Sequence, residues 1–259
     1  MSVVDDSFSQ PLALEEHAAL PLAGGLEQMG FQCGQLWGAA LAAGAEAYRR
    51  FGPGPRAEAA AVVAAQRLAG SFQASYKSIN CSDVIELDWK NAQGKQVLKF
   101  FLKGGPIRCF SMTAGFARAT RRAIDAAFAD DELVPPEPPV SCAAQLARAM
   151  GAGDQHTVMA AGLAGGIGLS GGACGALGAA VWLIEMAGVT AGGASVEFNS
   201  PAATEAINRF VQCTACEFEC AKIAGRKFAD VHDHASYLAA GGCARLIEAL
   251  AGRDGGGGA

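Results

Sequence analysis

The sequence predicts an all-α protein made of two related helical units, and three observations lead to this prediction. Ala and other helix formers dominate a chain that is 51% hydrophobic, whereas aromatic residues make up only 7% of it. A segment rich in Gly and Cys occurs twice, and a Pro-rich stretch lies between the copies. We expect units at 1–133 and 141–259, a linker at 134–140 and a pseudo-twofold relation between the units.

The duplication is clearest in two segments that lie 141 positions apart. The first reads "GGLEQMGFQCGQLWGAALAAG" and the second "GGIGLSGGACGALGAAVWLIE", and their paired Gly, Cys and Leu residues coincide. A weaker sequence similarity between the two copies continues toward the end of each unit. The corresponding cysteines are Cys33 and Cys174, Cys81 and Cys220, and Cys109 and Cys243.

In the first unit, residues 54–72 predict a helix, because Pro55 suits the first turn of a helix and Gly70 suits its end. Residues 95–105 form the one stretch whose composition favours a strand. Residues 108–128 predict another helix.

In the second unit, residues 174–188 predict a helix that follows a Gly-rich loop. A long helix is expected over 201–228, with Ser200 as its N-cap and a proline at its first position. Residues 242–252 predict the last helix, before a Gly-rich C-terminal tail.

Residues 157–184 contain no Asp, Glu, Lys or Arg and are long enough to cross a bilayer. However, eight of these 28 residues are Gly, several in pairs, and paired Gly disfavours a helix. We therefore expect a buried core segment and no membrane span.

Composition also bears on location and partners. The net charge of −5 and the absence of a run of basic residues argue against nucleic acid as a partner. The acidic, polar start lacks the pattern of a secretory signal, so we expect a cytoplasmic protein. In a reducing compartment, nine cysteines are more often metal ligands or redox groups than structural disulfides. The loop "GGIGLSGG" lacks the Lys-Ser or Lys-Thr of a phosphate loop, which argues against a nucleotide site.

The densest group of thiols is Cys213, Cys216 and Cys220, which would share one stripe of the expected 201–228 helix. Converging thiolates are what soft metals and iron–sulfur clusters require. Cys142, Cys174 or Cys243 could complete a set of four. The alternative is that each Cys is a small buried hydrophobe.

Cys174 stands where the Gly-rich loop enters a helix, and a helix N-terminus lowers the pKa of a thiol. The neighbouring Gly171, Gly172 and Gly175 would leave room for a cofactor to approach. Tight packing of helices against small residues is the other explanation for these glycines.

The order Cys142, a Gly-rich segment, "ACGALGA" with Cys174, then Cys220 and Cys243 resembles the C_GCAxxG_C_C family of redox-active proteins. The resemblance covers both halves of the chain. It implies a small helical fold whose cysteines are the functional groups, in some relatives as iron–sulfur ligands. The first half matches three family cysteines, has no counterpart of Cys142, and has Gln35 where the motif has Ala.

The sequence thus predicts a redox-active protein that transfers electrons through an iron–sulfur cluster in the second unit. The alternatives are a metal-free thiol–disulfide oxidoreductase and a zinc-stabilised interaction module. A redox partner protein and a homodimer are further expectations. The predicted ligands come from one set of cysteines: Cys142, Cys174, Cys213, Cys216, Cys220 and Cys243. A second site in the first unit would use Cys33, Cys81 and Cys109.

Overall fold

The structure, a computed structural model, describes residues 1–259 apart from 9–11, 130–132, 191–195 and 253–259. The described residues form helices, joined by loops that contain two isolated β-bridges. The predicted all-α class is therefore confirmed. The expected Gly-rich tail lies outside the described residues.

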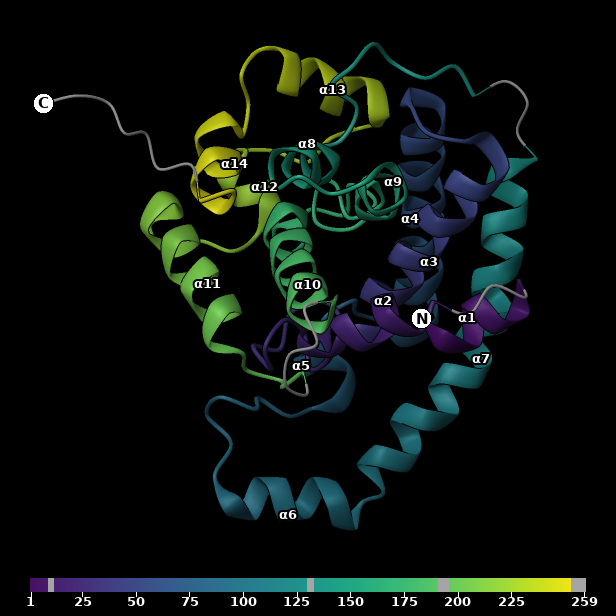
Figure 1. Cartoon of the computed structure of the whole chain (residues 1–259). Helices are drawn as coiled ribbons and strands as arrows, with labels where there is room; N and C mark the ends of the chain where they lie inside the picture. The colour runs from purple at the N-terminus through teal and green to yellow at the C-terminus, as the bar shows by residue number, and fades with distance from the viewer. Residues whose placement is uncertain (9–11, 130–132, 191–195, 253–259) are drawn as a thin grey trace, which may run out of the picture.

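The helices of the first half are α1 (Ser2–Ser7), α2 (Ala13–Ala18), the short 3-10 turn η1 (Leu20–Leu22), α3 (Gly34–Phe51), α4 (Pro55–Tyr76), α5 (Cys81–Ile85), α6 (Gly94–Leu102) and α7 (Gly105–Phe128). Those of the second half are α8 (Cys142–Ala149), α9 (Asp154–Ala161), α10 (Gly175–Thr190), α11 (Pro201–Thr214), α12 (Cys220–Ile223), α13 (Val231–Ala239) and α14 (Ala244–Leu250). Figure 1 shows both sets, coloured along the chain.

Helices α3, α4 and α10 form much of the core. Nearly every side chain of α10 is apolar, so this helix has no polar face to turn toward water and is buried along most of its length. Trp37 and Trp182 are fully buried between the halves' helices. The charge-free segment 157–184 is almost entirely buried, which confirms that it belongs to the core.

The two halves pack on each other reciprocally: α9 of the second half contacts α3, and α2 of the first half contacts α10. Some contacts join residues 141 positions apart, which are equivalent in the two copies. His156 Nε2 lies 3.0 Å from Glu15 Oε1, and the Trp37 ring lies against Gly178. Self-equivalent contacts of this kind are typical of an isologous interface. They favour the pseudo-twofold relation, which stays a prediction.

Three of the expected elements differ from the structure. Residues 95–105 are not a strand, because Gly94–Leu102 forms helix α6. Lys95 and Lys99 of this helix and its C-cap Lys103 recur at the four-residue spacing of one helix face. Helix α4 runs past Phe72, the last residue of the expected helix, to Tyr76.

The third difference concerns the expected 201–228 helix. Ser200 does cap it, since its Oγ accepts a hydrogen bond from the Ala203 N–H. Helix α11 nevertheless ends at Thr214, where Ala215 and Cys216 both adopt positive φ. The C-x2-C-x3-C segment is therefore spread over a helix end, a loop and the start of α12. The common stripe predicted for its thiols is wrong.

Across the described ranges, no helix combines the length and the apolarity that crossing a bilayer would require.

Candidate functional site

A loop with the same backbone geometry places cysteines in each half. In the first half, the Cys33 N–H donates to the Ile79 carbonyl at 2.8 Å, and the Cys81 N–H donates to the Phe31 carbonyl at 2.6 Å. The second half repeats both bonds. There the Cys174 N–H donates to the Phe218 carbonyl at 2.8 Å, and the Cys220 N–H donates to the Gly172 carbonyl at 2.7 Å.

The β-bridges Gln32–Asn80 and Ala173–Glu219 are the same feature seen twice. Each bridge pairs the residue that precedes one cysteine with the residue that precedes the other cysteine of the same half. The paired cysteines Cys33 and Cys81, and Cys174 and Cys220, thus occupy equivalent backbone positions in the two halves.

Glycines make this loop possible. Gly165, Gly166 and Gly171 have positive φ, as do their counterparts 141 positions earlier. Gly175 follows Cys174 and lies so close to the Leu163 carbonyl that a Cβ atom would be 1.6 Å from its oxygen. A Cβ atom at Gly172 would lie 2.5 Å from the Gln32 side-chain nitrogen, Nε2.

A Cβ at Gly171 would likewise meet side-chain atoms of Ala221 and Lys227, each at 3.0 Å. The chain's own atoms therefore occupy the space beside Gly171, Gly172 and Gly175. This arrangement favours close packing over the approach of a cofactor as the reason for these three glycines.

We call Cys142, Cys174, Cys220 and Cys243 the four-cysteine group. Each stands at the start of a helix: α8 and α12 begin with a cysteine, whereas α10 and α14 directly follow one. Cys142, Cys174 and Cys220 are buried and Cys243 is half-buried.

The four thiols influence one another electrostatically. Burial is the largest cause of the raised pKa of Cys220, and the charges of Cys174, Cys142 and Cys243 raise this pKa further. Burial also raises the pKa of Cys174, with further contributions from Cys142 and Cys243. The pKa of Cys243 rises to about 12 through burial and the charge of Cys142. Thiols from four separate segments therefore lie near enough to influence one another's pKa.

The expectation that a helix N-terminus lowers the Cys174 pKa is wrong. The backbone N–H groups of Ala176 and Leu177 do favour the thiolate, but burial outweighs them. The reason is that removing a charged thiolate from water costs more than two peptide dipoles return. At neutral pH the free thiols of the group are protonated.

Tyr237 of α13 is part of this site, although the sequence pattern did not point to it. The Tyr237 hydroxyl lies close enough to the Cys243 thiol to favour its thiolate, although burial outweighs this and raises the pKa of Cys243. Tyr237 and Cys243 also line a hollow of about 280 Å³, together with Cys213 of α11. The only sequence signal for Tyr237 is its position between two motif cysteines, and no spacing rule singles it out.

Cys213 and Cys216 are exposed, in contrast to the four-cysteine group. Cys213 faces the hollow beside Cys243, whereas Cys216 lies in the loop after α11. The structure thus separates these two residues from the buried thiols.

The first half has a smaller group of Cys33, Cys81 and Cys109. Burial raises the pKa of Cys33 to about 11, and the charge of Cys109 adds to this. Burial and the charges of Cys33 and Cys109 raise the pKa of Cys81 to about 12. Gln35, the departure from the family motif, donates from Nε2 to the Cys109 carbonyl at 2.9 Å and so ties α3 to α7.

The structure therefore contains two groups of buried and half-buried thiols, one in each half. As the side chains stand, no three His, Cys, Asp or Glu residues of the described chain are positioned to hold one metal ion. The chemistry on offer is that of sulfur: ligation of a soft metal, or reversible oxidation.

An all-α protein with a duplicated, cysteine-bearing loop is the class that the fold and the site define. One family model matches both halves, over residues 3–123 and 140–253, and its description reads "Putative redox-active protein (C_GCAxxG_C_C)". The chain belongs to this family, in two tandem copies. Comparison with the curated proteins found no match, and neither did comparison with the solved structures.

Proposed function

We propose that the protein transfers electrons through an iron–sulfur cluster held by the four-cysteine group. The observation that supports this most directly is the set of chemical groups around the thiols. Besides burial, other cysteines and two backbone N–H groups shift the pKa of Cys174, and other cysteines alone shift that of Cys220, with no Lys, Arg or His among them. Four such thiols can become thiolates together only if a cation replaces their protons.

The donor set suits such a cluster in kind, because iron–sulfur clusters in proteins are most often ligated by four thiolates. The bound cluster would supply one-electron oxidation and reduction. Binding would include rotation of the cysteine side chains, since no three of the described ligand residues converge on one point now.

The rest of the site would tune this chemistry. Burial of Cys142, Cys174 and Cys220 keeps water from the sulfurs. The Tyr237 hydroxyl would donate a hydrogen bond to the Cys243 sulfur, and hydrogen bonds to cluster sulfurs are one of the features that set a redox potential. Cys243, being half-buried beside a hollow, is the point nearest to an external redox partner.

The test is anaerobic purification and reconstitution of the full chain, with iron and sulfide analysis and a visible spectrum. The Cys174→Ser variant should lose at least half of the iron and the visible absorbance, because one ligand is removed. The matched control is Cys216→Ser, which removes an exposed thiol outside the group and should keep both. Full iron content in Cys174→Ser would contradict the proposal. Stoichiometric zinc without visible absorbance would instead support the zinc-stabilised module.

A second candidate, a metal-free thiol–disulfide oxidoreductase, rests on one observation: exposed Cys213 and half-buried Cys243 line the same hollow. The Cys213 thiolate would attack a small disulfide and release one thiol. Cys243 would then displace the second thiol, leaving a Cys213–Cys243 disulfide and a substrate reduced by two electrons.

Oxidised glutathione is the probe for this candidate. Mass spectrometry after treatment should find the Cys213–Cys243 disulfide in the parent protein, and glutathione retained on Cys213 in Cys243→Ser. An unmodified Cys213 in both proteins would rule the candidate out.

A further inference from the structure

Helix α6 is amphipathic, yet none of its residues is buried. Its apolar side chains cover roughly half of its circumference at 100° per residue, and Lys95, Lys99 and Lys103 lie together on the remaining side. A helix with this pattern normally buries its apolar face against its own protein. Here α6 contacts α7, and its Phe100 packs edge-on against the Trp89 ring, but the helix projects from the helical body (Figure 1).

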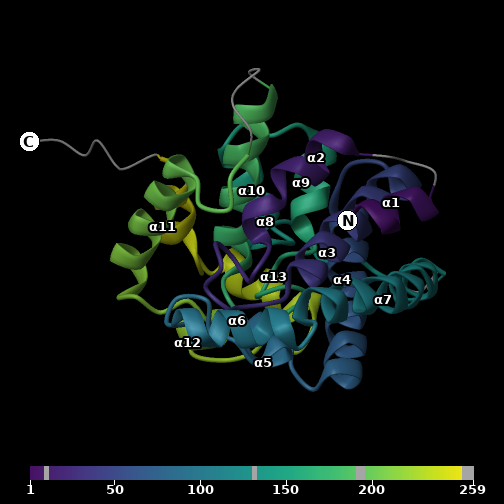
Figure 2. The ribbon, with the colours of Figure 1, turned by 90° about the horizontal axis from the view of Figure 1, so that it is seen from below.

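Exposed apolar side chains also occur on the first turns of α7. Five of the eight large hydrophobic residues that are exposed in the described chain fall between residues 98 and 110. These five are Leu98, Phe101, Leu102, Ile107 and Phe110. Leu102 is 78% exposed and Phe110 is 77% exposed, so the rest of the protein covers little of either residue. Exposed apolar side chains concentrated in one short stretch of the chain are typical of an interaction site. In the view from below, α6 lies in front of the body, which leaves it open to a partner (Figure 2).

Charge identifies the kind of partner. Residues 89–124 contain eight of the chain's 20 Lys and Arg residues and none of its 25 Asp and Glu residues. The remainder of the chain therefore has 12 basic against 25 acidic residues. A cationic, apolar segment on an otherwise acidic protein is complementary to a surface that is both anionic and apolar.

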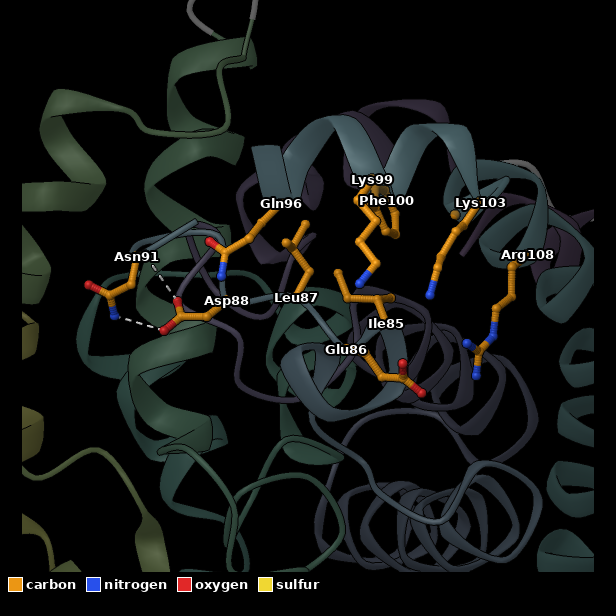
Figure 3. Close-up of a pocket in the computed structure, with 11 residues that line it drawn as sticks. Ile85, Glu86, Leu87, Asp88, Asn91, Gln96, Lys99, Phe100, Lys103 and Arg108 are labelled. Atoms are coloured by element: carbon orange, nitrogen blue, oxygen red, sulfur yellow. Dashed lines mark hydrogen bonds between the residues drawn. The ribbon is translucent and has the colours of Figure 1, made fainter. Parts of the chain in front are cut away.

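The cations of α6 and α7 are available for such a surface. Lys99, Lys103 and Arg108 are exposed and line a hollow of about 460 Å³ beneath α6. Figure 3 shows them pointing toward Glu86 and Ile85. Glu86 and Asp88 line the same hollow, but within the described residues none of the three cations forms an ion pair with either carboxylate. The long stems of Lys and Arg allow their charged ends to turn outward.

We propose that residues 94–110, here called the α6–α7 arm, dock the protein onto an anionic lipid surface. The arm has what interfacial helices use: Phe, Leu and Ile side chains that enter the acyl boundary, and Lys and Arg side chains that attract anionic headgroups. A second copy of the chain fits less well, because an isologous contact through the arm would set its cations opposite each other. Nucleic acid would use the cations but leave the five apolar side chains exposed.

The test is co-sedimentation of the full chain with vesicles of phosphatidylglycerol and phosphatidylcholine, compared with vesicles of phosphatidylcholine alone. We expect binding to the anionic vesicles only. Both Phe101→Ser/Leu102→Ser and Lys99→Gln/Lys103→Gln should weaken it by about tenfold or more, since each removes one of the two attractions. No α6 residue is buried, so these variants keep the core intact.

Matched controls make the same changes elsewhere. Leu14→Ser removes another exposed apolar side chain, and Lys222→Gln/Lys227→Gln removes two cations outside the arm. Both controls should bind like the parent. Failure of the parent to sediment with anionic vesicles would overturn the proposal. A second result would also overturn it. In that case the parent would not bind vesicles but would form a dimer by sedimentation equilibrium, and Phe101→Ser/Leu102→Ser would dissociate this dimer.

Discussion

Gln32 connects the two cysteine-bearing loops, and replacing it tests how the halves are held together. Its side chain is fully buried. Its Nε2 donates to the Gly166 carbonyl at 3.0 Å and to the Ala173 carbonyl at 3.1 Å. Its Oε1 accepts from the Ala173 N–H at 3.1 Å. Gln32 and Ala173 occupy equivalent positions in the two halves, so only the first half has a side-chain amide at this position.

Gln32→Ala removes three hydrogen bonds, two from the backbone of Ala173 and one from the Gly166 carbonyl, which still accepts from the Ser170 hydroxyl. At about 1 kcal/mol of net stability for each bond, the loss is about 3 kcal/mol. The empty space left by the side chain adds to this cost. With a denaturant slope of about 3 kcal/mol per molar, the urea midpoint should fall by about 1 M.

The assay is urea unfolding followed by far-ultraviolet circular dichroism, on the protein without metal. Gln73→Ala is the control, because Gln73 is exposed on α4, and this change should alter the unfolding free energy by less than about 0.5 kcal/mol. If Gln32→Ala unfolds within about 0.5 kcal/mol of the parent, the bonds to Gly166 and Ala173 do not hold the loops together, and the reasoning is refuted.

Two further predictions concern backbone space and a buried acid. Gly175→Ala should unfold the protein or render it insoluble, because a Cβ would overlap the Leu163 carbonyl. Its control is Gly188→Ala, in open space on the same helix, which should raise the unfolding free energy by up to about 1 kcal/mol. The two variants are compared by soluble yield and thermal midpoint. Burial raises the pKa of Asp5 from 3.8 to about 8. Between these values the unfolded chain has released the proton that the folded protein retains, so stability falls as pH rises from about 4 to 8. Asp5→Asn should flatten that slope in urea titrations across this range, and an unchanged slope would show that Asp5 is not its source.

The helical class, the duplication and the positions of the cysteines could all be read from the amino-acid order. Helix formation and capping depend on residues close together in the chain, so Pro55 and Ser200 could be assigned their roles directly. The repeat could be recognised because equivalent residues stay at a constant spacing. Close packing around Gly175 was among the alternatives, but composition did not separate it from the approach of a cofactor.

Which thiols meet, and in what environment, depends instead on how distant segments pack. The end of α11 at Thr214 separates Cys213 from Cys220, although the local pattern continues as a helix. The pKa of Cys174 depends on burial by segments far away in the chain, which outweighs its own helix terminus. The Gln32 amide bonds backbone groups more than 130 positions away, and within the described chain the apolar face of α6 stays uncovered. Such effects arise from contacts between distant segments, whose free energies are not encoded in any local window of sequence.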